Sequence, residues 1–461
     1  MNRKLNLKLV LSIIATGLLS FCGVIIETAT NITFPTLMKE FSVNTASIQW
    51  MTTGYLLVAS IMMPLSAFLK KNFTSKKLFT TAAILFLIGL ILDITATNFI
   101  QLVGGRVIQG VGAGIALPLM FNIILEQAPI NKIGLLMGIG TLITAIAPAI
   151  GPTYGGLVVD VYGWREIFLF LMPVVILALI LGLLSIHQSS KPTHSSLDVI
   201  GLIYVAATFV GTIIGFSNLS SIKETPFNFF VPIVIGIIAL ILFIRHSSRT
   251  NSPLLNLKIF KNKSFSLHLV AFFLIQIIAL GISFILPNYI QLVNHQTALT
   301  AGLIVLPGAA LGAVLAPLSG TIYDKLGARK PIMFGITLQI IAMFLFFIKG
   351  KNLTTLYILS IYILLMIGMG SVMGNTMTNA LQQLDESQNA DGNGMFNTVQ
   401  QFAGAVGTAL VSTVISLSQN VNNGLSYSAK TAVGAKNSFL MLLIFLIIAC
   451  WSLNIVTKSH D

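Results

Sequence analysis

Apolar runs of about 20 residues recur along the whole chain of 461 residues, and they constrain its fold more than any other feature. A helix of this length spans the hydrocarbon core of a bilayer. In lipid each such segment has to be helical, because no water is present to hydrogen-bond an exposed backbone. The composition agrees, since 55% of the residues are hydrophobic and only 8% are charged. We therefore predict an all-α integral membrane protein.

The apolar runs predict fourteen transmembrane helices. With the N-terminus in the cytoplasm, 18 of the 26 lysines and arginines fall on the cytoplasmic side, 7 fall on the outer side, and Arg106 lies within a span. Cytoplasmic loops of membrane proteins carry an excess of basic residues, so both termini are predicted to be cytoplasmic. The same short loops account for the net charge of +13, which therefore gives no reason to expect a nucleic-acid partner.

An internal repeat predicts how these helices are grouped. The segment Pro64–Lys77 is similar to Pro317–Lys330, which begins 253 residues later. A duplicated six-helix unit repeats after roughly 190 to 200 residues, so the surplus fits two extra helices, Val199–Ser217 and Phe229–Ile244. The predicted domains are an N-terminal six-helix bundle (1–186), a central insert with the extra pair and its linkers (187–264), and a C-terminal six-helix bundle (265–461). Two repeated halves with a site between them are typical of alternating-access transporters.

Three charged residues lie inside apolar runs. An arginine at the bilayer centre costs between about 2.5 and more than 10 kcal/mol, so Arg106 is expected to face a protein interior with an acidic partner. The carboxylates placed to serve it are Glu27 and Asp93. Burial favours a protonated carboxyl and a nearby arginine favours the carboxylate, so Glu27 is a candidate proton carrier. A static ion pair is the alternative for Glu27, and an acid wetted at the outer surface is the alternative for Asp93.

Four segments resemble motifs of the major facilitator superfamily, and within it of the fourteen-span drug/proton antiporters that include quaternary-ammonium and lincomycin resistance exporters. The resemblance covers essentially the whole chain, and the segments are Glu27–Pro35, Arg106–Gly112, Ala147–Gly156 and Gly320–Lys330. It implies the major facilitator fold with two helices inserted between the bundles, in a bacterial cytoplasmic membrane. It also implies proton coupling through Glu27 and Arg106, a proton gradient in place of a cofactor, and function as a monomer. Asp93 has no counterpart in the family pattern, and its position alone suggests a second proton-coupling site or a counter-charge for a cationic drug.

Two of these segments suggest gating elements. Pro148 and Pro152 each remove a backbone donor and should bend the fifth helix, while Gly151 and Gly155 allow close packing there. In the family this motif marks antiporters, although tight packing without gating remains an alternative. The loop signature contributes Gly320, Asp324, Arg329 and Lys330. In its first-half copy, Ala67 replaces the glycine and Lys71 stands where an aspartate is expected.

A drug cavity needs adaptable apolar walls with a few polar groups. The candidate substrate-binding residues are Asn31, Trp50, Tyr55, Gln109, Gln276, Tyr289 and Met373. Each can instead be a packing or lipid-facing residue. The six histidines have no metal-ligand spacing and are expected to be solvated, and no metal site is predicted.

The function predicted from these features is proton-driven multidrug efflux, the export of amphipathic, cationic small molecules by alternating access. One alternative is a proton-coupled or facilitated uptake carrier for a small nutrient or metabolite. A membrane enzyme or sensor would need a catalytic constellation or a soluble domain, and the longest inner loop, Arg245–Ser264, is too short for a domain. The prediction is therefore a secondary active transporter and not an enzyme.

Overall fold

A computed structural model describes residues 6–129, 133–188, 196–219, 222, 225–250, 253–385, 388–422 and 424–458. Over these residues the chain forms fourteen long α-helices, which confirms the predicted fold class. Thirteen of the helices are long and apolar enough in their described residues to cross a membrane. The fourteenth, α6, contains several side chains outside the described set.

The first seven long helices are α1 (Leu7–Glu40), α3 (Trp50–Asn72, after the short α2 at Thr45–Ile48), α4 (Ser75–Ile94), α5 (Phe99–Gln127), α6 (Ile133–Val161), α7 (Arg165–Ser185) and α8 (Val199–Ser217). They are followed by α9 (Pro226–Ser247), the 3-10 helix η3 (Leu257–Lys261), α10 (Lys263–Leu292), α11 (Ala298–Leu326), α12 (Arg329–Lys349), α13 (Thr355–Leu381), α14 (Asn389–Gln419) and α15 (Tyr427–Lys458).

Short polar side chains begin many of these helices. Asn98 accepts a hydrogen bond from the backbone N–H of Gln101 at 2.9 Å, and Thr297 accepts one from Thr300 at 3.1 Å. Such caps satisfy backbone donors that have no partner within the helix. At the end of α11, Gly327 has φ +78°, a left-handed conformation that glycine adopts without steric cost. Local sequence therefore sets where the apolar runs start and stop.

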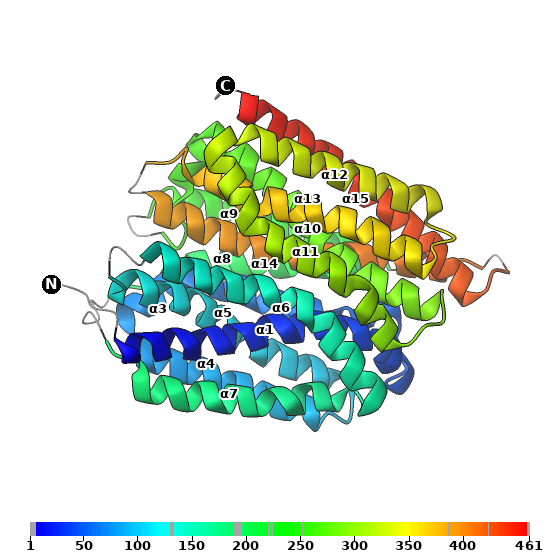
Figure 1. Ribbon diagram of the computed structural model, residues 1–461, viewed down its shortest axis with the longest axis horizontal. Coiled ribbons are helices and arrows are strands. Elements are labelled where there is room, and N and C mark those ends of the chain that lie inside the picture. Colours follow the sequence, from blue (N-terminus) through cyan, green and yellow to red (C-terminus); the bar gives the residue numbers. More distant parts are fainter. Residues whose placement is uncertain are drawn as a thin grey trace.

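The helices lie side by side, with both chain termini at the same end of the molecule (Figure 1). We call this the terminal end, and the other the opposite end. In the first half of the chain, α4 packs against α5 and α7, and α1 packs against α5, α6 and α7. In the last part, α10 packs against α14 and α15, and α13 packs against α11 and α12. The exact domain boundaries stay a prediction.

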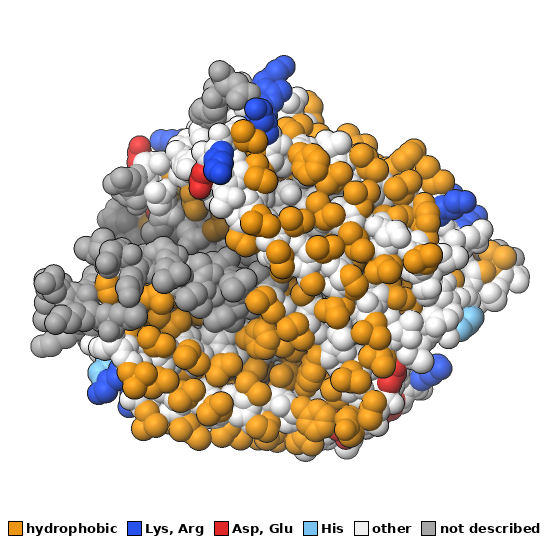
Figure 2. All heavy atoms as spheres, in the orientation of Figure 1, with side chains coloured by type: hydrophobic (Ala, Val, Ile, Leu, Met, Phe, Trp, Pro, Cys, Tyr) orange, Lys and Arg blue, Asp and Glu red, His pale blue; other side chains and the backbone are white. Residues whose placement is uncertain are grey.

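Apolar side chains cover most of the described surface on the face shown in Figure 2, and lysines and arginines gather near its edges. On α9, which packs mainly on α8, large apolar residues such as Val234, Ile238 and Ile241 are about half exposed. A continuous apolar exterior is unfavourable in water and favourable in lipid. The chain is therefore a multi-pass membrane protein.

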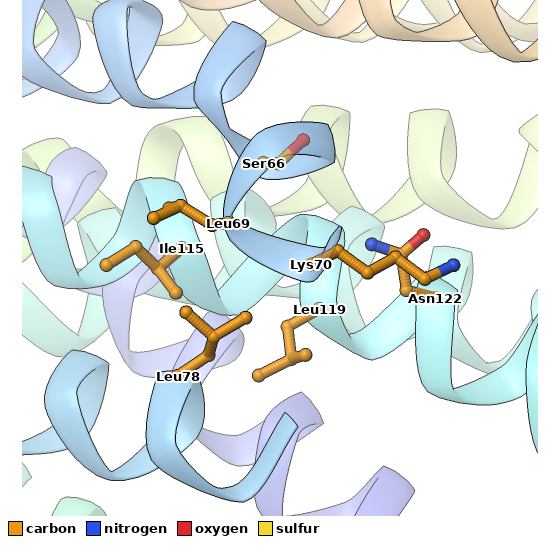
Figure 3. A pocket seen from close by; sticks show the side chains of 7 residues that line it. All are labelled: Ser66, Leu69, Lys70, Leu78, Ile115, Leu119 and Asn122. Carbon is orange, nitrogen blue, oxygen red and sulfur yellow. The ribbon is translucent and has the colours of Figure 1, made fainter. Parts of the chain in front are cut away.

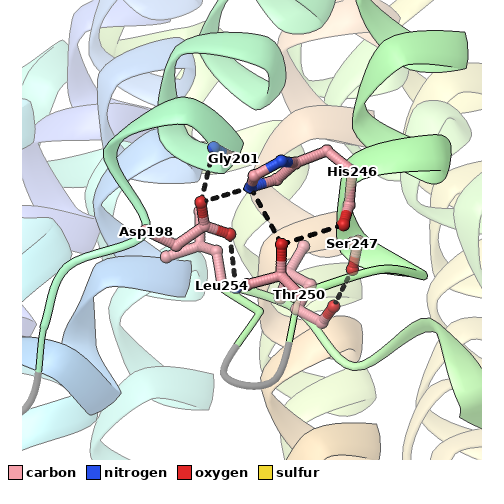
Figure 4. A network of polar contacts seen from close by, with 7 residues as sticks. Asp198, Gly201, His246, Ser247, Thr250 and Leu254 are labelled. Atoms are coloured by element: carbon pink, nitrogen blue, oxygen red, sulfur yellow. Dashed lines mark hydrogen bonds and ion pairs between the residues drawn. The ribbon is translucent and has the colours of Figure 1, made fainter.

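The inserted pair α8–α9 is fastened by a polar network at the terminal end (Figure 4). Asp198 caps α8 by accepting a hydrogen bond from Gly201 N–H at 2.8 Å, contacts His246 Nε2 of α9 at 2.7 Å, and accepts from Leu254 N–H at 3.1 Å. Burial works against the charge, but the bonds from Gly201, His246 and Leu254 together lower the pKa of Asp198 below its ordinary value. One carboxylate thus joins α8, α9 and the linker to α10.

Candidate functional site

Arg106 is fully buried and fixed against α3. It lies about 10 Å along α5 from the opposite end, at 1.5 Å per residue. Its Nε donates to Met51 O at 3.1 Å, its Nη1 donates to Gln109 Oε1 at 2.6 Å, and its guanidinium lies 4.4 Å from the centre of the Tyr55 ring. The cation over an aromatic face contributes further stabilisation in a desolvated site. Nη2 has no partner among the described residues.

Gln109 connects Arg106 to Asp93. Its Nε2 donates to Asp93 Oδ2 at 2.8 Å, while its Oε1 accepts from the arginine. Asp93 is 0% exposed and its Oδ1 has no described partner, so the alternative of an acid wetted at the outer surface is wrong. Glycines make this crossing of α4 and α5 possible, because a Cβ on Gly105 would overlap the Asp93 carboxylate and one on Gly89 would overlap Gln109. We call Arg106, Gln109 and Asp93 the buried relay.

Glu27 lies buried on α1, a helix that packs against α5, α6, α7 and α10. The side chain is 8% exposed, and among the described residues it forms no ion pair. The direct Glu27–Arg106 ion pair is therefore absent here, although the two groups are close enough to interact electrostatically. Glu27 keeps a small accessible surface while Asp93 is sealed. Of the two acids, Glu27 is the one better placed to exchange a proton.

Two predicted substrate residues join α1 to α3 beside the relay. Asn31 Oδ1 accepts a hydrogen bond from Thr52 Oγ1 at 2.7 Å, and the Asn31 Nδ2 donor has no described partner. The Tyr55 hydroxyl donates to Gly23 O at 3.0 Å while its ring supports Arg106. With Gln109, these residues surround the charged groups, and their substrate role stays a prediction.

The other predicted substrate residues lie elsewhere. Tyr289 is buried, and its hydroxyl accepts from Leu353 N–H at 3.0 Å, so it holds the segment before α13. Gln276 is buried on α10, Trp50 is partly buried at the start of α3, and Met373 of α13 packs against the apolar core. None of the four makes a described hydrogen bond to the relay, and their role in substrate binding also stays a prediction.

The fifth-helix motif packs directly on α1, next to Glu27. A Cβ on Gly151 would overlap the Thr28 side chain, and one on Gly155 would meet Ala29 O. Pro148 and Pro152 lie within the same helix. A movement of α6 would therefore displace Thr28 and Ala29, the residues that follow Glu27 on α1.

At the opposite end α6 also packs on α11, across the two halves of the chain. A Cβ on Gly156 would overlap Ala298 O, and one on Gly302 would meet Pro152 O. Leu299 N–H donates to Asp160 Oδ2 at 2.7 Å across the same contact. We call this contact the opposite-end seal. Here the backbones of α6 and α11 pack directly against each other.

The loop signature is mostly solvent-facing at the terminal end. Asp324 and Lys330 are exposed, a Cβ on Gly320 would meet open space, and Arg329 Nη2 donates to Asn454 Oδ1 of α15 at 3.4 Å. The gating role of these residues stays a prediction.

At the matching end of the first half, Lys70 Nζ pairs with Glu126 Oε1 at 2.8 Å, beside the residue that replaces the expected aspartate. Lys70 lines a small hollow with Ser66, Leu69, Leu78, Ile115, Leu119 and Asn122 (Figure 3). Two features of the sequence bear on this pair, a basic residue near the end of α3 and an acidic one near the end of α5, but no spacing joins them.

One buried histidine was missed by sequence reasoning. His268 on α10 is 0% exposed, so the expectation of a solvated side chain is wrong for it. His194 and His460 lie outside the described residues. In the part of the chain that is described, no three His, Cys, Asp or Glu side chains are grouped to hold a metal ion.

A buried arginine-to-aspartate relay and a close-packed seal between two groups of membrane helices define the class, a helical membrane transporter. The chain belongs to the Major Facilitator Superfamily, whose family model matches residues 16–408. This membership confirms the predicted family and the prediction of a transporter in place of an enzyme.

Comparisons with individual proteins agree. The chain is 34% identical over 406 residues to the lincomycin resistance protein LmrB of Bacillus subtilis (strain 168), covering 87% of this chain and 85% of the relative. It is 26% identical to the riboflavin transporter RibZ of Clostridioides difficile (strain 630), covering 93% and 92%. Its fold is similar to a crystal structure of a bacterial homolog of the human lysosomal transporter Spinster, inward-facing and unoccupied, with TM-score 0.72, 14% identity and coverage of 99% and 98%.

Proposed function

We propose that the chain exports drugs from the cytoplasm in exchange for protons. The observation that carries this proposal is the placement of Glu27, a buried acid that keeps a small accessible surface. It interacts with a fixed guanidinium, and the next two residues, Thr28 and Ala29, contact the helix that forms the opposite-end seal. The related lincomycin resistance protein supports drugs as the substrate class. The energy source is the proton gradient, with no bound cofactor, and the terminal end is the cytoplasmic end.

The proposed cycle uses the charge of Glu27 to choose between two arrangements of the halves. The ionised carboxylate interacts with Arg106, and protonation removes that interaction. Because Thr28 and Ala29 touch α6, a change in the position of α1 alters how α6 meets α11. A proton or drug shifts the equilibrium only if it interacts differently with the two arrangements. Because the proton and the drug compete for Glu27, binding of one favours release of the other, and this gives exchange.

An acid beside a buried arginine also suggests the substrates. A cationic amphipath gains from a carboxylate that has no direct ion pair and from apolar walls, and neither favours an anion. We therefore expect cationic or neutral amphipathic drugs. The protein is expected to act as a monomer in a bacterial cytoplasmic membrane.

Everted membrane vesicles test this proposal. A proton gradient should drive uptake of a fluorescent cation into vesicles with the wild-type protein, and Glu27→Gln should abolish gradient-driven uptake while leaving substrate binding measurable. Asp385→Asn, an exposed acid outside the helices, is the matched control and should behave as wild type. Gradient-driven uptake that survives Glu27→Gln removes Glu27 from the coupling step.

The second candidate is an uptake carrier for a nutrient, which the relative named as a riboflavin transporter favours. The direction of transport separates the two functions. Whole cells expressing an exporter accumulate less labelled compound than cells without it, and a nutrient carrier gives more. Parallel assays with lincomycin and riboflavin decide between them.

A further inference from the structure

The membrane part of the C-terminal half contains a buried titratable group that the proposed cycle does not use. All the acids discussed so far within spans belong to α1 and α4, in the first half. His268 lies on α10, five residues from its first residue, so it is about 7.5 Å from the terminal end of that helix. It is fully buried, yet close to the surface from which a proton can arrive.

Both ring nitrogens of His268 are engaged. Nδ1 lies 2.7 Å from Ser264 O, which can only accept, so Nδ1 carries a hydrogen. Nε2 lies 2.7 Å from Asn379 Nδ2, an amide donor on α13, so Nε2 presents its lone pair. This arrangement fits a neutral imidazole, and a protonated one would place two donors face to face.

Asn379 connects the imidazole to Tyr323 of α11. The Tyr323 hydroxyl lies 3.2 Å from Asn379 Oδ1 and 2.7 Å from Gln382 Oε1, and it can donate to either oxygen. If the Asn379 amide turns over, its oxygen accepts from a protonated Nε2 and its NH₂ group donates to the Tyr323 oxygen. Tyr323 then donates to Gln382 alone. Both protonation states can thus be satisfied, with different bonds between α11 and α13.

We propose that His268 is a second proton-binding residue of the transport cycle, and that Asn379 and Tyr323 carry its protonation state to the end of α11. Tyr323 directly precedes Asp324 of the loop signature, so the network reaches the segment expected to gate the terminal end. The proton binds the Nε2 lone pair and leaves from the same atom. This inference rests on the proposed proton-driven export, to which it adds a site in the other half.

At the terminal end, α10 and the elements packed on it carry other charged and titratable groups. They include Lys263 of α10 itself, Lys258 and Lys261 of η3, Tyr323, Asp324 and Lys325 of α11, Asp385 after α13, Asp391 of α14, Lys458 of α15, and Lys8 of α1. Asp391 accepts a hydrogen bond from Asn256 at 2.8 Å, and Tyr323 joins the network itself.

A spectroscopic titration tests the inference without relying on transport. In protein labelled with [15N]histidine and held in lipid nanodiscs, the resonances lost in His268→Gln identify His268. They should report Nδ1–H and an unprotonated Nε2 at high pH, and protonation of Nε2 between about pH 5 and pH 8. Tyr323→Phe should move this midpoint. A ring that stays neutral over the whole range overturns the inference.

Transport then shows whether the proton is used. In everted vesicles, the ratio of export rates at about pH 6 and pH 8 should change at least threefold in His268→Gln, and Asn379→Asp should move the profile up by about one pH unit because a carboxylate favours the charged ring. His187→Gln, a histidine outside this network, is the control. If His268 titrates but the pH dependence of export is the same in these variants as in the wild type, the inference fails. If wild-type export needs no proton gradient, the proposed function fails instead.

Discussion

At the scale of single residues, the site depends on an amide between two charges. Gln109 can donate to Asp93 and accept from Arg106 at the same time, which neither a carboxylate nor an aliphatic side chain can do. The surrounding glycines leave room for this amide and for no larger neighbour. The neutral amide of Gln109 joins the Arg106 guanidinium to the Asp93 carboxylate without direct contact between the two charges. Asp93 is fully buried, so Glu27 is the acid of the two that keeps some accessible surface.

Gln109→Leu should destabilise the protein and uncouple transport. It leaves Asp93 Oδ2 and Arg106 Nη1 without partners, and each unsatisfied buried group costs about 1–3 kcal/mol. Thermal unfolding in detergent should show a lower midpoint than for Gln296→Leu, an exposed glutamine in a loop. Equal midpoints for the two variants would mean that the relay contributes nothing to folding.

Asp198 gives a second residue-scale prediction, for the dependence of stability on pH. Its pKa is lower in the folded protein, so its contribution is present above the ordinary carboxyl value and is lost as the pH falls through the folded value. Asp198→Ala should lose a helix cap, about 0.5–2 kcal/mol. The difference in unfolding midpoint from wild type should be present at about pH 5 and shrink below about pH 4. A difference that grows as the pH falls below about 5 contradicts the assignment. Asp385→Ala, which removes an exposed acid outside the helices, serves as the carboxylate control.

At the scale of helices, sequence reasoning succeeded where the physics is local. Length and apolarity placed the helices, and the motif of Ala147–Gly156 gave the close-packed helix. It could not find contacts between distant segments. The motif comparison showed that Lys71 stands where an aspartate is expected, but it did not predict that the neighbouring Lys70 pairs with Glu126, 56 residues later. His268 was placed in solvent because its partners, Asn379 and Tyr323, come from helices that only the fold brings together.

The opposite-end seal gives the helix-scale prediction. Gly156→Val should force α6 away from α11, because overpacking a close contact costs about 1–3 kcal/mol. A single cysteine introduced by Ala298→Cys, in a background without Cys22 and Cys450, should react faster with a water-soluble maleimide. Gly104→Val is the matched control, since a Cβ there meets nothing within 4 Å. Equal reaction rates for the two valine variants argue against a gate at this contact.

At the scale of the whole molecule, the inserted pair bridges the two halves. At the opposite end, Gln49 Nε2 donates to Ser217 Oγ at 3.1 Å, which joins the first half to α8. Thr413 Oγ1 donates to Phe216 O at 3.0 Å, which joins α14 to the same end of α8. The linker after α9 adds further bonds to the C-terminal half, from Asn256 to Asp391 and from Asn262 to Gln383 O at 2.6 Å. The linker before α8 is bonded to the first half in turn, with Ser75 N–H donating to Gln188 Oε1 at 2.8 Å and Gln127 Nε2 donating to His187 O at 3.0 Å. The asymmetry therefore lies in helix packing, since α8 packs more extensively on α14 than on α3.

We expect the insert to move with the C-terminal half when the two halves tilt. Spin labels on α8 and α14 should keep one distance distribution with and without a proton gradient or drug, while labels on α8 and α4 should show two. The Asn256→Ala, Asn262→Ala double variant removes both linker bonds and should broaden the α8–α14 distribution, whereas Asn294→Ala, in the loop after α10, should leave it unchanged. If the α8–α4 distance stays fixed and the α8–α14 distance changes, the insert belongs with the first half. The bonds of the first half to His187, Gln188 and Ser217 would then outweigh the packing of α8 on α14.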